Sequence, residues 1–333
     1  MKGKKVMVAG GAGFIGSQMV RELLLLGAEV SVYDNFLHGT YQNLEEVRGE
    51  IDLTVGDLLD EWKLISTLEK IRPDYIFDFV GDTYVPTAYE IPKRFFNINV
   101  EGTMNLLLAC KFVGIKRMLY VSSTEIYGEP KGNAPMDEDH IINPYNTYAV
   151  SKTAADRLCY TLNKEKDIPV IIARIYNSYG PRETEPYVIP EIIAQLDKGP
   201  ILKLGNTAAR RDFTYVSDTC RGLIATMLSD IPNGEAVNVG SGISYSILEL
   251  ASLIAEIIGR SDYRIEVEQA RLRKLDIDFF LCNPGKLYKA TGWKPKVGIH
   301  EGLQETVSWY MTHGRKWSWE DWAVGTLLFD GKA

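Results

Sequence analysis

The feature that most constrains this chain is a glycine cluster between a short apolar run and a longer helical run. Val6 to Ala9 predicts a buried strand, GGAGFIG follows at residues 10–16, and the next residues predict a helix to about Leu26. The spaced glycines are Gly10, Gly13 and Gly16. They permit a tight turn and let a pyrophosphate approach the free N–H groups of the helix start, beside Phe14 and Ile15. A plain glycine-rich turn is the alternative, but the position between strand and helix favours a dinucleotide site.

An acidic residue ends the second predicted strand. Glu29 to Tyr33 forms that strand, and Asp34 follows it, about 20 residues beyond the glycines. A carboxylate there accepts hydrogen bonds from the adenosine ribose and repels a 2′-phosphate, which predicts NAD rather than NADP. Asn35 belongs to the same predicted site. The alternative is a turn that starts at Asp34, and it is the weaker interpretation.

Strand-like and helical runs alternate through the first half of the chain. Further strands are predicted at 52–55, 75–80, 117–122 and 170–175, with helices near 60–71, 97–114 and 147–166. This alternation predicts an α/β fold with a doubly wound parallel sheet of the Rossmann type, covered on both faces. We expect a dinucleotide-binding domain over residues 1–175. A smaller C-terminal lobe should follow over 176–333, with part of the chain returning to the first domain.

Loops at the carboxyl edge of such a sheet are where ligands bind. Asp57 and Leu58 follow the third strand, where Asp57 could accept a hydrogen bond from the adenine amino group. A surface turn is the alternative and, without context, the better interpretation. The loop from Gly81 to Pro86, which contains Thr83, follows the fourth strand.

Composition excludes several classes of protein. The chain has 333 residues, 45% of them hydrophobic and 24% charged, as in an ordinary globular protein. The formal net charge of −7 argues against nucleic acid as the main partner. Four scattered cysteines predict reduced, buried thiols rather than a disulfide framework or a zinc site, and no metal is expected. No apolar run is long enough to span a membrane, and the N-terminus predicts a strand rather than a signal peptide, so we expect a cytoplasmic protein.

A tyrosine and a lysine share one face of the helix predicted at 147–166. Tyr148 and Lys152 are four residues apart, which places them one above the other. The lysine charge could lower the pKa of the phenol from its usual value of about 10 and make it a proton acceptor. Ser123, Thr124 and Glu125 follow the predicted strand 117–122 at the same sheet edge.

With these motifs in this order, and with Asn177 to Arg182 (NSYGPR) after them, the chain resembles the extended short-chain dehydrogenase/reductase family. It is most similar to the nucleotide-sugar epimerases, 4,6-dehydratases and decarboxylases, and the resemblance runs from about residue 4 to about 312. It implies a tightly held NAD that oxidises a sugar at C4 and later returns the hydride. Tyr148 would take the hydroxyl proton, Lys152 would bind the nicotinamide ribose, and Ser123 or Thr124 would hydrogen-bond the same hydroxyl.

The resemblance also implies a substrate site for a nucleotide diphosphate sugar. Asn177 would bind the diphosphate, and residues 184–190 would close over the nucleotide. Lys203 would lie near the base, and Arg211 would hold phosphate or sugar with a guanidinium group suited to it. Arg271, preferred over Arg273, would be a late diphosphate arginine. The tail from 316 to 333, which holds three tryptophans, has no implied role.

Glu125 bears on the fate of the C4 ketone. The ketone acidifies the C5 proton, so a placed carboxylate can remove it and drive loss of the C6 hydroxyl. This favours a 4,6-dehydratase, although the thymidine-type enzymes have Asp where this chain has Thr124. A UDP-glucuronate-type decarboxylase and a 4-epimerase stay open as alternatives. The non-enzyme alternative is an NAD-binding regulatory module, which would need neither Tyr148 with Lys152 nor Glu125.

Two predicted helices, 97–114 and 147–166, each carry a second, partly apolar face. These faces could dock against a second copy of the chain as a four-helix interface, which predicts a homodimer. The alternative is that both faces are buried within one subunit.

Overall fold

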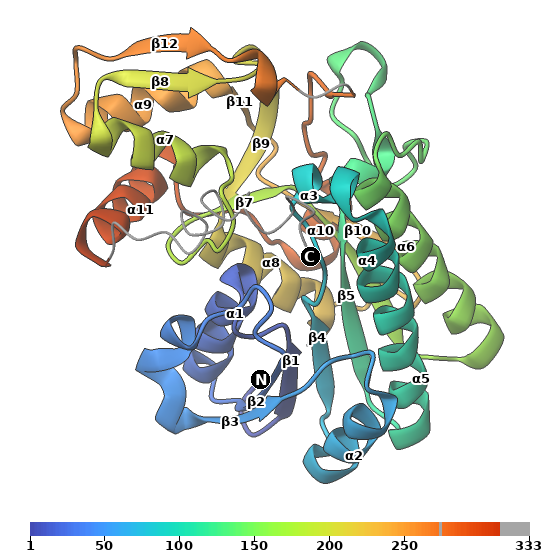
Figure 1. Cartoon of the computed structure of the whole chain (residues 1–333). Coiled ribbons are helices and arrows are strands. Elements are labelled where there is room, and N and C mark those ends of the chain that lie inside the picture. The colour runs from blue at the N-terminus through green and yellow to red at the C-terminus, as the bar shows by residue number, and fades with distance from the viewer. Residues whose placement is uncertain (273–274, 314–333) are drawn as a thin grey trace, which may run out of the picture.

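A seven-stranded parallel sheet forms the centre of the computed structural model, which describes residues 1–272 and 275–313 (Figure 1). In sheet order the strands are β10 (Ala236–Val239), β6 (Val170–Ile175), β5 (Arg117–Ser123), β4 (Tyr75–Asp78), β1 (Lys5–Ala9), β2 (Glu29–Asp34) and β3 (Ile51–Val55). Every neighbouring pair runs parallel. The order turns back at β1, so the sheet is doubly wound and the predicted fold class is confirmed. Arg273 and the tryptophan-rich tail lie outside the described residues.

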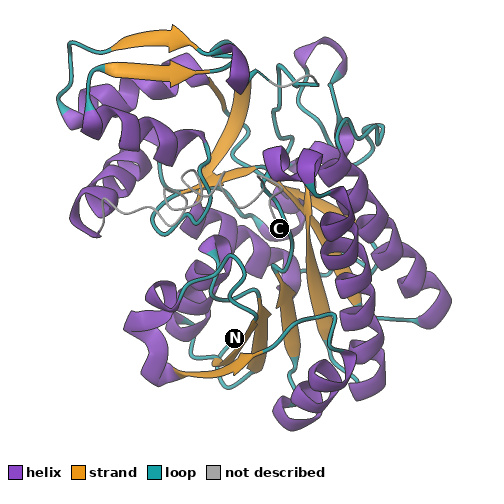
Figure 2. Ribbon diagram, in the orientation of Figure 1, coloured by secondary structure: helices purple, strands orange, loops and turns teal. Residues whose placement is uncertain are grey.

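Helices cover both faces of this sheet (Figure 2). One layer holds α1 (Phe14–Leu25), α8 (Val216–Leu228) and α10 (Gly285–Thr291), and the other holds α2 (Glu61–Ile71), α5 (Thr103–Val113) and α6 (Thr147–Lys166). Alternate residues of β1 belong to the two cores: Val6 and Val8 to one, Met7 and Ala9 to the other. Burial on both faces is why the strands are apolar along their length.

A second lobe is built from the chain that follows β6. Its helices and strands are β7 (Asn177–Tyr179), α7 (Val188–Lys198), β8 (Ile201–Leu204), β9 (Arg210–Tyr215), β11 (Ser244–Ser246), α9 (Ile247–Ile258), β12 (Arg264–Val267) and α11 (Ile299–His313). The strands form a three-stranded and a two-stranded sheet, and a separate core holds them against α7, α9 and α11. Between these elements the chain returns to the large sheet as α8, β10 and α10.

Short helical segments complete the described chain. They are η1 (Tyr41–Glu50), α3 (Val85–Glu90), α4 (Pro92–Phe96), η2 (Asn97–Gly102), η3 (Thr124–Tyr127), η4 (Lys131–Asn133) and η5 (Gln269–Arg271). All four cysteines are buried, as expected. None of the helices in residues 1–272 and 275–313 has the length and apolar character that crossing a bilayer requires.

Two element boundaries differ from the prediction. The fourth strand ends at Asp78 rather than Val80, because the Asp78 side chain accepts the Val80 N–H at 3.1 Å and turns the chain out of the sheet. The helix predicted at 97–114 begins as a wide, π-type turn over 97–102, and α5 proper starts at Thr103. Asn99 lies in this turn, fully buried, and its amide exchanges hydrogen bonds with the backbone of Asp82. The irregular turn therefore fixes the loop after β4, as such turns often do near functional sites.

A buried ion pair ties α6 to the end of the central strands. Arg174 of β6 binds both carboxylate oxygens of Asp156 at 3.0 Å, and their side chains are 3% and 0% exposed. Ser122, the second-last residue of β5, donates to the same carboxylate at 2.9 Å. The network fixes α6 and the carboxyl end of β5 relative to each other.

We expect Asp156→Ala to lower the free energy of unfolding by roughly 3–5 kcal/mol, because it leaves the Arg174 guanidinium buried without its partner. Urea unfolding followed by circular dichroism measures this. The double variant Asp156→Ala/Arg174→Met should recover part of the loss, since it leaves no guanidinium buried without its partner. A loss no larger than that of the exposed control Asp262→Ala would contradict the role of the pair.

Candidate active site

A pocket of about 950 Å³ lies between the carboxyl edge of the large sheet and the second lobe. The predicted site residues that line it are Gly10, Gly13, Phe14, Ile15, Gly16, Asp34, Asn35, Asp57, Leu58, Thr83, Ser123, Thr124, Glu125, Tyr148, Lys152, Asn177, Arg211 and Arg271. Lys203 does not line it. Lys203 has an exposed side chain on β8, and the end of that strand reaches the pocket through Leu204, Gly205 and Asn206 instead.

The glycine cluster leaves room for a ligand at one position in particular. A Cβ on Gly16 would lie 2.0 Å from the Gly10 carbonyl oxygen, and a Cβ on Gly10, whose φ is +76°, would lie 2.9 Å from the Phe79 backbone. Packing within the chain therefore requires these two glycines. A Cβ on Gly13 would meet only the Gly10 oxygen at 3.4 Å. Its missing side chain instead opens space in the pocket at the start of α1, where a dinucleotide pyrophosphate fits.

Asp34 makes the turn that was considered as the alternative, and its carboxylate also lines the pocket. Its carboxylate accepts the Phe36 N–H at 2.8 Å, which makes the turn, and the Ala12 N–H at 2.8 Å, which holds the glycine loop. Burial raises the pKa of Asp34, and these backbone N–H groups oppose that rise. The carboxylate still lines the pocket, so a ribose hydroxyl can reach its remaining lone pairs. On the same edge, Asn35 donates to Asp57 at 2.9 Å.

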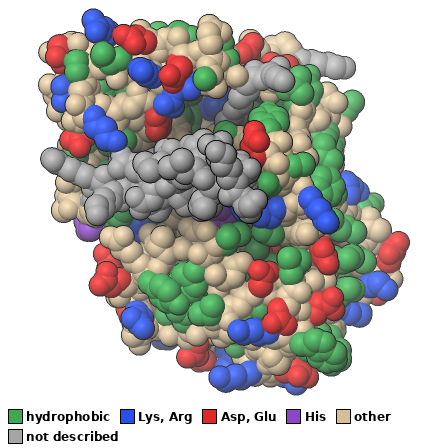
Figure 3. Space-filling model, in the orientation of Figure 1, with side chains coloured by type: hydrophobic (Ala, Val, Ile, Leu, Met, Phe, Trp, Pro, Cys, Tyr) green, Lys and Arg blue, Asp and Glu red, His purple; other side chains and the backbone are tan. Residues whose placement is uncertain are grey.

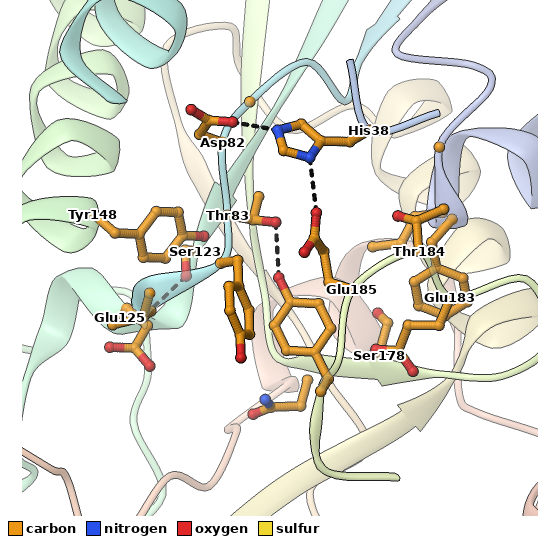
Figure 4. Close-up of a pocket in the computed structure, with 18 of the residues that line it drawn as sticks. His38, Asp82, Thr83, Ser123, Glu125, Tyr148, Ser178, Glu183, Thr184 and Glu185 are labelled. Atoms are coloured by element: carbon orange, nitrogen blue, oxygen red, sulfur yellow. Dashed lines mark hydrogen bonds and ion pairs between the residues drawn. The ribbon is translucent and has the colours of Figure 1, made fainter. Parts of the chain in front are cut away.

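Tyr148, near the start of α6, meets the end of β5. Its side chain is 7% exposed and points toward Ser123, which lies beside Glu125 in Figure 4. Burial raises the pKa of the phenol; the hydrogen bond with Ser123 opposes this, and the Glu125 charge adds to it. Tyr148 therefore lies buried at the end of β5, with its phenol hydrogen-bonded to Ser123.

Lys152 does not act on Tyr148 as the sequence predicted. Its ammonium donates to the Val121 carbonyl at 2.6 Å and lies 4.5 Å from the centre of the Tyr120 ring. Burial lowers its pKa to about 8, and the Asp78 charge opposes that change. The expected lowering of the phenol pKa is absent from the structure, because Lys152 is directed at the backbone of β5. It still lines the pocket, where it can reach a ribose.

Glu125 is held at both of its ends. Its backbone N–H donates to the Ser123 hydroxyl at 3.2 Å, and its carboxylate accepts from the Asn146 amide at 3.0 Å. Thr124, between Ser123 and Glu125, is buried and lines the same wall. The structure thus brings together a phenol, two hydroxyls and a carboxylate at one end of the pocket, which is a set suited to proton transfer.

A segment of the second lobe, residues 182–187, crosses to the first lobe, and we call it the strap. Glu185 pairs with His38 at 2.8 Å (Figure 4). The Tyr187 hydroxyl bonds Thr83 at 2.8 Å, and Arg182 pairs with Glu46 at 2.8 Å. His38 also contacts Asp82, which is buried and pairs with Arg94. The resemblance had suggested closure by residues 184–190. Nothing in the sequence identified His38 as its anchor.

The predicted substrate arginines are already paired with carboxylates. Arg211 meets Asp276 at 3.3 Å and stacks over the Phe280 ring at 5.1 Å. Arg271 pairs with Glu191 at 3.0 Å and Glu268 at 2.7 Å. Asn177 is exposed at the pocket wall. These groups surround the part of the pocket that faces the second lobe.

Comparison with known proteins assigns the family. Residues 7–306 match the family model described as GDP-mannose 4,6 dehydratase. The chain belongs to this family. The suggested membership of the extended short-chain dehydrogenase/reductase family, in its nucleotide-sugar epimerase and dehydratase group, is thereby confirmed.

Members of this family that resemble the chain differ in the reactions their names state. The UDP-N-acetyl-alpha-D-glucosaminuronate decarboxylase of Bacillus cytotoxicus is 33% identical, over 92% of this chain and 98% of that protein. The dTDP-glucose 4,6-dehydratase of Streptomyces venezuelae, solved with NAD, is 29% identical with a TM-score of 0.85, over 92% of this chain and 97% of that chain. The UDP-glucose 4-epimerase of Thermotoga maritima, solved with UDP-glucose, is 28% identical with a TM-score of 0.85, over 92% and 98%. The NAD in the dehydratase structure agrees with the predicted cofactor.

The anchor of the strap gives a pH prediction. Burial would lower the pKa of His38, but the hydrogen bonds and charges of Asp82 and Glu185 outweigh it and raise the pKa to about 9. A raised pKa adds stability that is fully present below the unfolded value of about 6.5 and is lost as the pH rises through about 9. We expect this contribution of protonated His38 to the free energy of unfolding to reach roughly 3 kcal/mol.

The measurement compares urea unfolding of the wild type and His38→Gln from pH 6 to pH 10. The difference between the two should be largest at the acidic end and should shrink toward the alkaline end. The exposed His300→Gln serves as the control and should follow the wild type. A difference that stays constant across the range would show that the charge of His38 does not stabilise the strap.

Proposed function

We propose that this protein is a nucleotide-diphosphate-sugar 4,6-dehydratase, a lyase that uses bound NAD and makes a 4-keto-6-deoxy sugar nucleotide. The observation that carries the proposal is the Glu125 carboxylate, which Asn146 holds in the same pocket wall that Ser123 and Tyr148 line. A chain that only oxidised and reduced C4 would have no need of a carboxylate beside the phenol. A carboxylate at this place supplies the base that elimination requires.

In the first step, oxidation at C4, each of three residues has a separate role. When bound, NAD supplies the acceptor and later the donor of a hydride. Tyr148, acting as the phenolate, receives the C4 hydroxyl proton, and Ser123, hydrogen-bonded to the phenol oxygen, orients that hydroxyl. Lys152, fixed on the Val121 carbonyl, lines the same pocket and offers its ammonium to a ribose.

Glu125 carries the second step. The C4 ketone acidifies the C5 proton, which the carboxylate takes. As the C6–O bond breaks, the protonated Glu125 gives this proton to the departing hydroxide, which leaves as water. Thr124, adjacent on the same wall, can donate a hydrogen bond to the departing oxygen. Return of the hydride to C6 and of a proton to C5 completes a reaction whose net change is the loss of one water.

A uronate decarboxylase is the second candidate, supported by the 33% identical relative. Its substrate carries a carboxylate at C6, which needs a cation at the reacting end of the pocket. Among the described residues that line the pocket, the cations are His38, Lys152, Arg211 and Arg271. Three of them pair with carboxylates and Lys152 donates to the Val121 carbonyl. Glu125 would repel the added charge, so an uncharged C6 hydroxymethyl fits this wall better.

The test is the mass of the product. Incubation with UDP-, GDP- and dTDP-hexoses and with the corresponding uronates should give loss of water from one hexose. Loss of carbon dioxide would favour the decarboxylase, and an unchanged mass with a new stereoisomer would favour the epimerase. Bound NAD with no turnover of any sugar would favour a regulatory module.

Glu125→Gln separates the two steps. It should still oxidise C4, so bound NADH accumulates in single-turnover absorbance, while water loss falls about 100-fold or more. The control Tyr148→Phe should retain NAD but form no NADH, because the first proton has no acceptor. Formation of dehydrated product by Glu125→Gln at the wild-type rate would remove Glu125 from the mechanism.

We also propose that the protein is a homodimer through α5 and α6. Hydrophobic side chains lie along the edge of the molecule where these helices run (Figure 3). They are Met104, Leu108 and Phe112 of α5, and Val150 and Tyr160 of α6, all at least 37% exposed. An apolar stripe of this kind is typical of an interface.

Phe112→Glu with Leu108→Glu should halve the mass measured by sedimentation equilibrium, whereas Trp62→Glu, on exposed α2, should not change it.

A further inference from the structure

Asn146, the residue just before α6, makes two contacts with one side chain. Its Oδ1 accepts the Ala149 N–H at 2.8 Å, which caps the helix, and its Nδ2 donates to Glu125 Oε2 at 3.0 Å. The side chain is 7% exposed. A backbone N–H can only donate, so the oxygen of the amide must face Ala149 and the nitrogen must face Glu125. The orientation of the amide is therefore fixed by the chemistry of its partners.

A helix cap alone does not call for asparagine. Serine, threonine, aspartate and asparagine all cap helices well. Aspartate would place a second carboxylate against Glu125, and serine is too short to span from the Ala149 N–H to the carboxylate. Asparagine is the capping residue whose acceptor and donor are separate atoms, so it caps the helix and holds Glu125 at once.

These contacts close a ring around the reacting groups. Glu125 is joined by its backbone N–H to Ser123, Ser123 is hydrogen-bonded to Tyr148, and Tyr148 lies two residues after Asn146 on the helix that Asn146 caps. Asn146 then returns to the carboxylate of Glu125. The ring sets the carboxylate and the phenol relative to each other. Asn146 binds the Oε2 oxygen of the carboxylate, and Oε1 does not take part in this contact.

We propose that Asn146 is a positioning residue that holds the Glu125 carboxylate for the step after C4 oxidation. It acts through Glu125 and does not touch the reacting atoms of the sugar. The inference rests on the proposed function, since it assigns a support to the residue that carries the second step. A misplacement of about 1 Å can slow such a step 100-fold.

The test uses Asn146→Ser and Asn146→Asp in the full-length protein with NAD bound. Both keep a capping side chain, so the melting temperature should stay within about 3 °C of the wild type. C4 oxidation, measured as bound NADH in a single turnover, should change less than about 3-fold. Water loss should fall about 10- to 100-fold, so that NADH accumulates. Asn143→Ser, the same change at an exposed position, should match the wild type.

Coupling to Glu125 distinguishes positioning from a structural role. In a Glu125→Gln background, adding Asn146→Ser should alter the rate of the second step by less than about 2-fold, because its only route of action is already removed. Equal slowing of both steps by Asn146→Ser, or an equal effect of it with and without Glu125→Gln, would overturn the proposal. So would water loss at the wild-type rate in both Asn146 variants.

The same data separate this inference from the proposed function. If the wild-type product has lost carbon dioxide or kept its mass, the protein is not a dehydratase. The comparison of single and double variants then still tests whether Asn146 acts through Glu125. Water loss in the wild type with no coupling between the two residues removes the Asn146 proposal alone. A Glu125→Gln variant that turns over normally removes both.

Discussion

Burial of the parallel sheet on both faces is the constraint on which the rest of the structure depends. The inner strands are therefore mostly apolar, and many of the polar groups of the sheet stand where a strand ends. Asp34, Asp78 and Ser123 end β2, β4 and β5 at one edge. Because neighbouring strands run parallel, groups that lie far apart in the sequence arrive side by side. The pocket is a consequence of how the sheet is buried.

Much of this could be predicted from the sequence, because the signals are local. The strand, the glycines and the helix after them specify a turn within a few residues, and the helical spacing of Tyr148 and Lys152 specifies a shared face. Observed α2 and α6 lie within one residue of their predicted bounds. The fold class and the wall of Ser123, Thr124 and Glu125 follow from such patterns.

The features that could not be predicted depend on contacts with residues elsewhere in the fold, which no local sequence pattern reports. His38 and Glu185 are separated by most of the first domain, so nothing in either stretch predicts their pairing. Lys152 shares a helix face with Tyr148, yet its long side chain reaches the Val121 carbonyl. A buried ammonium is unfavourable without a hydrogen-bond acceptor, and this carbonyl supplies one. Nothing in the sequence singled out Asn146, because a capping residue looks the same whether or not its second atom has a partner.

The strap also affects how long a bound ligand stays in the pocket. In the proposed reaction, a sugar that has lost a hydride must stay until the hydride returns, or the protein is left with a reduced cofactor and no partner for it. Three separate contacts, at His38, Thr83 and Glu46, must break before the strap can lift. We expect the oxidised sugar to dissociate slowly compared with its onward reaction. The lifetime of the closed state then sets how often a catalytic cycle is completed rather than abandoned.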